Sequence, residues 1–167
     1  MRSVLISALF ALASGGGGAA QDLWQGQSAA FFGVIYLDTS LEGEVDGPRA
    51  DETARVALVS DLLADELEAH GLVLLDLAPV AQELDRVGNP AKCNGCEVRM
   101  ADELGAKYAI VSEVQKVSNL IQSINVVVRD AETGATVRAK AVDMRGNTDN
   151  AWLRAMRYVL EHGVFTE

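Results

Sequence analysis

The sequence predicts an α/β fold of mixed α+β type, in which helices pack on a single mixed β-sheet. In the first half of the chain, apolar runs alternate with segments of helical period, and this alternation favours parallel strands joined by helices. In the second half, three strand-like segments follow one another through short turns, which is typical of an antiparallel meander. The expected order is β-α-β-α-α-β-β-β-α, and a hydrophobic content of 49% is enough for one core.

The first expected strand is the nearly continuous apolar run at 31–37, whose aromatic and β-branched residues are typical of a strand buried on both faces. A polar, acidic loop is expected at 41–49. A helix then begins near Asp51 and ends before Gly71, since glycine takes the left-handed conformation that often closes a helix. Its apolar stripe at helical period consists of Val56, Val59, Leu62, Leu63 and Leu67. A second buried strand is expected at 72–77.

The second half begins with two short helices, expected at 79–87 and 97–104. Three strands follow, at 107–117, 121–129 and 136–144. The last two strands are joined by a tight hairpin turn in which Gly134 supplies a positive φ. A final helix begins at Thr148 or Asp149 and ends at His162-Gly163, and its apolar face carries Trp152, Met156 and Val159.

The N-terminus has the layout of a secretory signal peptide, which we assign to residues 1–20. Arg2 supplies a positive charge, the run at 4–13 is apolar, and Gly18-Ala19-Ala20 offers the small side chains that a cleavage site requires. The apolar run is well short of the roughly 20 residues that span a bilayer. No later segment has the length and apolarity of a membrane span. Because of the signal peptide, we expect a mature protein that is periplasmic or secreted.

After the signal, the sequence predicts a flexible segment at 21–30 and a single domain at 31–167. The formal net charge of −10 repels phosphate backbones, which argues against nucleic acid as a partner. The acidity suits a basic protein or a cation, and we expect the partner to be another periplasmic protein. No pattern indicates a cofactor, and none decides the oligomeric state.

The only two cysteines form a Cys-x-x-Cys pair, Cys93 and Cys96, with three interpretations. In an oxidising compartment the simplest is a small disulfide loop, for which Asn94-Gly95 supplies the turn. The second is a thiol-redox pair, since Cys93 is expected near a helix N-terminus, where a thiolate is stabilised. The third is a metal site, in which Met100 adds a thioether suited to Cu(I). A c-type haem is excluded, because Glu97 stands where that motif needs histidine.

An acidic stretch is the second candidate site. Glu42, Glu44 and Asp46 alternate before a glycine, as in the start of a calcium-binding loop. The twelfth position of such a loop, which needs a bidentate carboxylate, is Thr53. A solvated loop is the alternative to a weak cation site.

The sequence shows no ordinary catalytic constellation, and we expect a protein that is not an enzyme. His70 and His162 both precede a glycine at an expected helix end, where hydrogen bonding to the last carbonyls accounts for them. Neither a G-x-S-x-G motif nor a phosphate-cradling glycine loop after a strand is present.

Two stretches resemble the amino-terminal α/β domain of TolB-like periplasmic proteins. They are Leu-Gly-Ala-Lys-Tyr-Ala-Ile-Val at 104–111 and Val-Val-Arg-Asp-Ala-Glu-Thr-Gly at 127–134, a strand start and a hairpin turn. The chain is also similar to small, uncharacterised secreted bacterial proteins with a Cys-x-x-Cys before this strand, some of them associated with quinoprotein dehydrogenases. No β-propeller follows here, so the resemblance implies a fold and a use in protein contacts, and not TolB's own role.

Together these observations favour a non-catalytic periplasmic or secreted module that binds another protein, for which the edge strands of the sheet are available. The alternative, which depends on Cys93 and Cys96, is a thiol-redox or metal-handling accessory protein of a periplasmic oxidoreductase system of the quinoprotein type.

Overall fold

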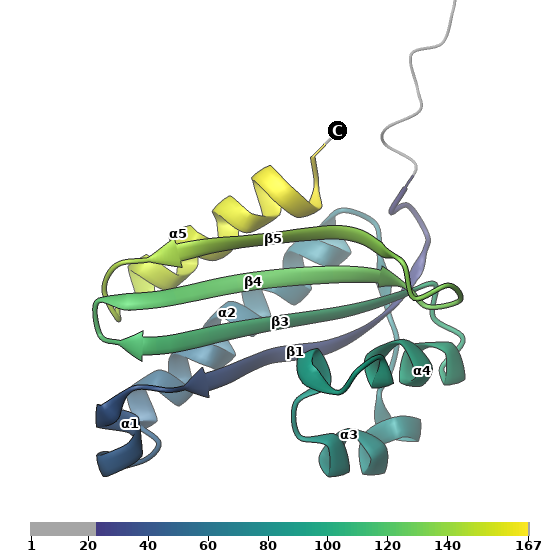
Figure 1. The fold of residues 1–167 in the computed structure, drawn as a ribbon. Coiled ribbons are helices and arrows are strands. Elements are labelled where there is room, and N and C mark those ends of the chain that lie inside the picture. The colour runs from purple at the N-terminus through teal and green to yellow at the C-terminus, as the bar shows by residue number, and fades with distance from the viewer. Residues whose placement is uncertain (1–22, 167) are drawn as a thin grey trace, which may run out of the picture.

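Five strands form one mixed sheet in the computed structural model, which describes residues 23–166 (Figure 1). The strands are β1 (Ser28–Asp38), β2 (Val73–Leu74), β3 (Tyr108–Ser118), β4 (Ile121–Asp130) and β5 (Thr136–Met144). Their spatial order is β2-β1-β3-β4-β5. β1 pairs in parallel with β2 and β3, and the pairs β3–β4 and β4–β5 are antiparallel. The predicted fold class, a parallel first half and an antiparallel meander, is confirmed.

Helices cover both faces of this sheet, but unequally. The helical elements are α1 (Leu41–Asp46), α2 (Ala50–Ala69), η1 (Ala78–Val80), α3 (Ala81–Val87), η2 (Pro90–Lys92), α4 (Cys96–Glu103), α5 (Asp149–Val159) and η3 (Leu160–Val164). The long helices α2 and α5 lie along one face, and α3 and α4 lie on the other side of the sheet at one end (Figure 1). None of the helices in the described part of the chain is long and apolar enough to cross a bilayer.

The main core lies between the sheet and the pair α2 and α5. The expected apolar stripe of α2 packs there, with its central positions Val59, Leu63 and Leu67 fully buried. The cap predicted at Thr148 is confirmed, since its side chain accepts a hydrogen bond from the backbone N–H of Ala151. The predicted face of α5 is also confirmed, because Trp152, Met156 and Val159 are all 0% exposed.

A smaller core lies between α4 and the start of the parallel strands. Ala30 of β1 and Ala109 of β3 are buried there with Phe32 and Met100. The small alanine side chains let α4 approach the sheet closely. This second layer covers only one end of the face, so the other end of the same face has no helix over it (Figure 1).

A bulge in β1 explains why its sequence is apolar almost without interruption. The register with β3 shifts between Phe31 and Val34, and Gly33 between them has a φ of 80°, which glycine adopts without strain. Phe31 and Val34 therefore both pack with the main core, while Phe32 packs with the second core.

Three sequence-based boundaries are wrong. The loop expected at 41–49 contains α1, because Ser40 caps a helical turn by accepting a hydrogen bond from Gly43. The strand expected at 72–77 is shorter in the structure, where it consists of the two residues of β2. The first strand, expected from residue 31, already begins at Ser28, and Trp24 before it is 7% exposed. The predicted signal peptide, 1–20, lies outside the described residues.

Candidate functional site

The structure joins Cys93 and Cys96 in a disulfide between η2 and the first residue of α4, with their Cα atoms 5.5 Å apart. Asn94 and Gly95 between them both have positive φ, of 58° and 90°, and form the tight turn that the sequence predicted. Cys96 is 1% exposed in the second core, whereas Cys93 is only partly buried. Cys93 is therefore the more accessible member of the pair.

Few side chains near the disulfide could act as ligands of a metal ion. Among the described residues, Cys93, Cys96 and Glu97 bring one ligand atom each to within 4.8 Å of one another. Met100 is fully buried and packs as a residue of the second core. Because the two sulfurs are bonded to each other, neither is a thiolate ligand in this state. A metal would need the reduced pair.

A buried carboxylate that sequence analysis did not single out as a functional group faces the disulfide. Glu97, in the first turn of α4, is 4% exposed. Its Oε2 lies 3.4 Å from Sγ of Cys93, and its Oε1 lies 3.5 Å from Nε of Arg129 on β4. A buried carboxylate is costly unless it is paired, so the cation on β4 is the compensating charge for Glu97.

A second buried carboxylate ties the cysteine loop to the sheet. Glu113 of β3 is 5% exposed, and it accepts a hydrogen bond of 3.1 Å from Nδ2 of Asn89. The Nζ of Lys92, one residue before Cys93, lies 3.2 Å from the same carboxylate. The loop that carries the disulfide is thus attached to the middle of β3 by a charged group and an amide.

The acidic stretch, the weak candidate for a cation site, forms the short helix α1. In α1, residues two apart point to different sides of the helix, and Glu44 and Asp46 are exposed. Only Glu42 turns inward, where its Oε2 lies 3.1 Å from Nζ of Lys116. The three carboxylates therefore do not converge on one point, and the reason is that Glu42 pairs with a cation of the protein itself.

Lys116 is the centre of a charged cluster at the far end of β3 from the disulfide. Its side chain is 0% exposed, and its Nζ lies 2.7 Å from Oε1 of Glu52 and 3.3 Å from Oδ2 of Asp38. Burial disfavours the charged ammonium, but hydrogen bonds to Glu52, Glu42 and Asp38 outweigh it and raise the pKa of Lys116 above its ordinary value. Burial likewise opposes ionisation of Asp38, yet hydrogen bonds from Ser40 and Lys116 hold its pKa below the ordinary value.

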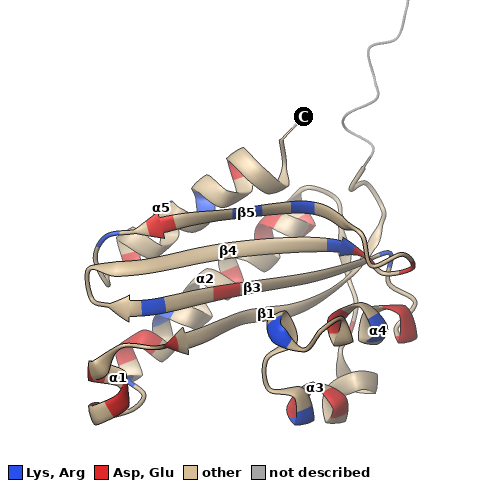
Figure 2. Ribbon diagram, viewed as in Figure 1, with Lys and Arg blue, Asp and Glu red and all other residues tan. Residues whose placement is uncertain are grey.

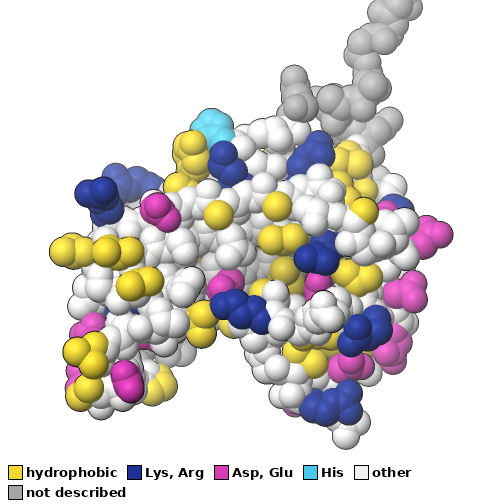
Figure 3. All heavy atoms as spheres, in the orientation of Figure 1, with side chains coloured by type: hydrophobic (Ala, Val, Ile, Leu, Met, Phe, Trp, Pro, Cys, Tyr) yellow, Lys and Arg dark blue, Asp and Glu magenta, His cyan; other side chains and the backbone are white. Residues whose placement is uncertain are grey.

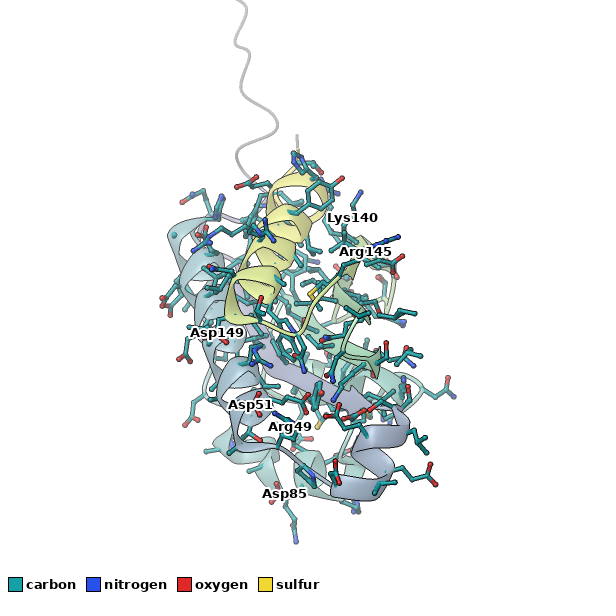
Figure 4. The ribbon with its side chains drawn as sticks, turned by 90° about the vertical axis from the view of Figure 1, so that its left-hand side faces the viewer. Arg49, Asp51, Asp85, Lys140, Arg145 and Asp149 are labelled. Carbon is teal, nitrogen blue, oxygen red and sulfur yellow. A yellow bond between two sulfur atoms is a disulfide. The ribbon has the colours of Figure 1, made fainter. Side chains whose placement is uncertain are left out.

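Arg55 of α2 extends this cluster toward the start of α5. Its Nε donates to Oδ1 of Asp149 at 2.9 Å, and its Nη1 donates to Oδ1 of Asn147 at 2.6 Å. Asn147 in turn donates to Glu52, which links the two halves of the cluster. Asp51 and Asp149 lie on the same side of the molecule, at the starts of α2 and α5 (Figure 4).

The Lys116 cluster is a brace between elements and not a reactive centre. Lys116 is paired with carboxylates from α1, α2 and the end of β1, and Arg55 is paired with Asp51 and with Asp149 of α5, so the ion pairs join these elements to one another. Sequence analysis missed it, although one signal was present: Lys116 stands in phase with Ile110 and Val114 on the face of β3 that packs against the main core. A lysine at an inward position of a strand indicates buried carboxylate partners.

The two histidines also have structural surroundings. His70 stacks on Phe165 with ring centroids 3.5 Å apart, and its Nδ1 lies 2.8 Å from the carbonyl oxygen of Glu66. His162 packs edge-to-face against Tyr158. Neither contact involves a nucleophile.

Exposed apolar side chains gather at the end of the sheet that α3 and α4 leave uncovered. Val117, Leu120 and Ile121, at the turn between β3 and β4, are 50%, 72% and 61% exposed, and we call these three residues the hairpin tip. Leu41 and Val45 of α1 are 75% and 74% exposed. Figure 3 shows hydrophobic side chains on this end of the molecule.

A pocket of about 550 Å³ opens beside the hairpin tip. Its lining consists of Leu120, Ile121, Gln122, Asp143, Met144 and Arg145. Asp143 near the end of β5 and Arg145 just after it are the charged residues of this lining, while acidic residues dominate α1 (Figure 2). The end of the sheet therefore combines an apolar surface with charges of both signs at its rim.

Comparison with known protein families gives a match over residues 27–164, to the DUF3280 family, described as a protein of unknown function (DUF2380). The chain belongs to this family. A comparison with curated proteins finds no match. The resemblance to TolB-like domains is therefore wrong, and the comparisons give no link to quinoprotein systems. The stretches that suggested it are a strand start and a hairpin turn, which many sheets of this kind share.

Solved structures with the same fold are distant in sequence. The C-terminal domain of LpoB from Salmonella enterica matches with a TM-score of 0.51 and 15% identity, over 75% of this chain and 87% of that one. Lipoprotein GNA1162 from Neisseria meningitidis matches with a TM-score of 0.50 and 16% identity, over 80% of this chain and 92% of that one. At such identities the likeness shows the fold alone, which this DUF3280 protein shares with both.

Proposed function

We propose that this DUF3280 protein is an exported, non-catalytic interaction module that docks a partner protein on the hairpin tip and the pocket beside it. The observation that carries the proposal is the exposure of Val117, Leu120 and Ile121 together at one end of the sheet. Large contiguous apolar patches are uncommon on soluble monomers and often mark sites of interaction.

The chemistry around the tip fits a protein interface. The pocket has an apolar wall from Leu120 and Met144, while Asp143 and Arg145 supply charge at its edge. An apolar centre with a polar rim is the usual composition of a protein–protein interface. The charged groups around Lys116 are paired internally, so the proposed interface depends on the exposed apolar side chains of the tip.

An extracytoplasmic location is part of the proposal. It is supported by the signal-like N-terminal sequence, by a disulfide formed from the only two cysteines, and by the fold shared with GNA1162, which is a lipoprotein. Oxidising compartments are where such a disulfide persists.

Site-specific photo-crosslinking in living cells tests the proposal. A photoreactive residue at Leu120 is compared with one at Leu58, an exposed leucine on α2 that is 38% exposed. We expect a discrete adduct with one other protein from position 120 and none from position 58. We also expect Ile121→Asp to remove the adduct while the circular dichroism spectrum is unchanged. Equal adducts from both positions, no adduct at 120, or an adduct with a second copy of the chain would each overturn the proposal.

A further inference from the structure

We propose that the Cys93–Cys96 disulfide is a redox site, which exchanges reversibly with a thiol reductant such as a protein dithiol. The proposal goes beyond the docking function, because it concerns the other end of the molecule. It depends on three observations: the unequal exposure of the two cysteines, the position of Cys96 in α4, and the buried carboxylate of Glu97.

The reduced chain can remain folded, which a reversible redox couple requires. The disulfide closes a loop with a sequence separation of only three, and the entropy gained by closing so short a loop is small. The segment is held without the bond, since Met100 and Ala101 anchor α4 in the second core. Glu113 holds the preceding segment through Asn89 and Lys92.

The geometry assigns a different role to each sulfur. Cys93 is partly exposed, whereas Cys96 is 1% exposed, so an incoming thiolate reaches Cys93. Cys96 is the first residue of α4, which has eight residues. The backbone N–H groups and the dipole at the start of α4 favour a thiolate at Cys96, while its burial and the Glu97 carboxylate, within 4.8 Å of its sulfur, oppose one. Because Cys93 is the accessible sulfur, attack at Cys93 with departure of Cys96 is the favoured direction.

Glu97 distinguishes the oxidised from the reduced state. Its Oε2 lies 3.4 Å from Sγ of Cys93, and no other hydrogen-bond donor among the described residues contacts this carboxylate apart from the ion-pair partner Arg129. A disulfide sulfur carries no hydrogen, so this buried oxygen faces a group that cannot donate. In the dithiol, the S–H of Cys93 donates to it or to the carbonyl oxygen of Pro90, 3.1 Å away. The dithiol thus gains a hydrogen bond that the disulfide lacks.

The thiol–disulfide exchange proceeds in two steps. A thiolate of the partner dithiol attacks Sγ of Cys93, a new S–S bond forms, and the electron pair of the old bond leaves with Cys96 as a thiolate. The second thiol of the partner then attacks the mixed disulfide and releases Cys93. The partner loses two electrons and two protons and becomes a disulfide, and Cys93 and Cys96 gain them as two thiols.

Equilibration with glutathione, used as the probe, tests the redox role. The purified protein is incubated in mixtures of reduced and oxidised glutathione, quenched with acid, and its free thiols are counted by a maleimide mass shift. We expect a folded protein whose thiol content rises from none to two within the accessible range of ratios. A protein that stays oxidised at the most reducing ratio, or that unfolds when reduced, would overturn the proposal.

Single cysteine variants test the roles of the two sulfurs. We expect Cys96→Ser to form a glutathione adduct at Cys93, detected by intact mass spectrometry, and Cys93→Ser to form at least tenfold less adduct at the buried Cys96. Equal adducts would contradict the assigned direction.

A pair of glutamate variants tests the positioning role of Glu97. We expect Glu97→Gln to shift the midpoint ratio of glutathione about fivefold toward the disulfide, because a neutral acceptor is weaker than a carboxylate. Glu113→Gln is the matched control, since this equally buried carboxylate contacts the loop but no sulfur. Equal shifts of the midpoint ratio in the two variants would contradict a specific positioning role for Glu97.

Discussion

Replacement of Lys116 by methionine is the sharpest test of what holds the open end of the sheet together. The substitution keeps the length of the side chain but removes the ammonium from among three carboxylates. Glu42 and Asp38 have side chains that are 30% and 16% exposed, so water can partly replace the lost cation. Glu52 is 1% exposed and keeps only the hydrogen bond from Asn147.

The expected loss of stability follows from the difference in burial between Glu52 and the other two carboxylates. Removing one partner of a buried ion pair destabilises a protein by about 3–5 kcal/mol, because the remaining charge is left in the interior. Since Glu52 alone stays fully buried, we expect Lys116→Met to lower the free energy of unfolding by about 3 kcal/mol. We expect Lys116→Met combined with Glu52→Gln to recover more than half of this loss, because the double variant buries no uncompensated charge.

Urea unfolding at pH 7, followed by the fluorescence of the buried Trp24 and Trp152, measures these changes. Lys107→Met is the matched control: its ion pair with Asp130 is short, at 2.6 Å, but the lysine side chain is 42% exposed. Because water can replace the exposed ammonium of Lys107, we expect a clearly smaller loss for the control. A loss below about 1 kcal/mol for Lys116→Met, or an equal loss for the control, would refute the view that the cluster is a brace.

Three further predictions concern single contacts. Thr148→Ala removes the cap that accepts from Ala151, and we expect a loss of about 1 kcal/mol in urea unfolding. Trp152→Phe removes the Nε1–H that donates to the buried Gln122 at 3.0 Å, and we expect a loss of about 2 kcal/mol by the same assay. The lowered pKa of Asp38 contributes stability above its ordinary pKa that disappears as pH falls through the folded value, so we expect the wild-type urea midpoint to be constant near neutral pH and to fall below about pH 4. Asp38→Asn should flatten this acid slope.

Periodicity predicted most of the scaffold because it reports on burial, which is a local property of each strand or helix. The alternation at 121–129 and the stripe on α2 are both read from neighbours in sequence, and both are confirmed. The boundaries failed where a tertiary contact decided the outcome. At 41–49, the polar composition predicted a loop, but the Ser40 cap and the pairing of Glu42 with Lys116 stabilise a helical turn.

In the candidate sites, too, local features were predicted from the sequence and features that depend on tertiary contacts were not. The cysteine spacing and the signal-like N-terminus together favoured a disulfide loop with an Asn94-Gly95 turn over a redox pair or a metal site, and the structure contains this disulfide. The spacing could not indicate that Glu97 faces Cys93, because that contact depends on how α4 lies on the sheet. Contacting residues of the Lys116 cluster are separated by up to 95 positions along the chain, as between Asn147 and Glu52, and no local pattern connects positions so far apart.

The sequence by itself determined the fold class, the antiparallel order of the second half, the cap at Thr148 and the turn between Cys93 and Cys96, because turn chemistry and the alternation of apolar residues act over a few positions. Only the tertiary structure decided which charges are buried together, which cysteine is accessible, and which apolar residues remain exposed at the hairpin tip. Those properties depend on which faces of distant elements meet, and burial changes the energy of a charge far more than its neighbours in sequence do.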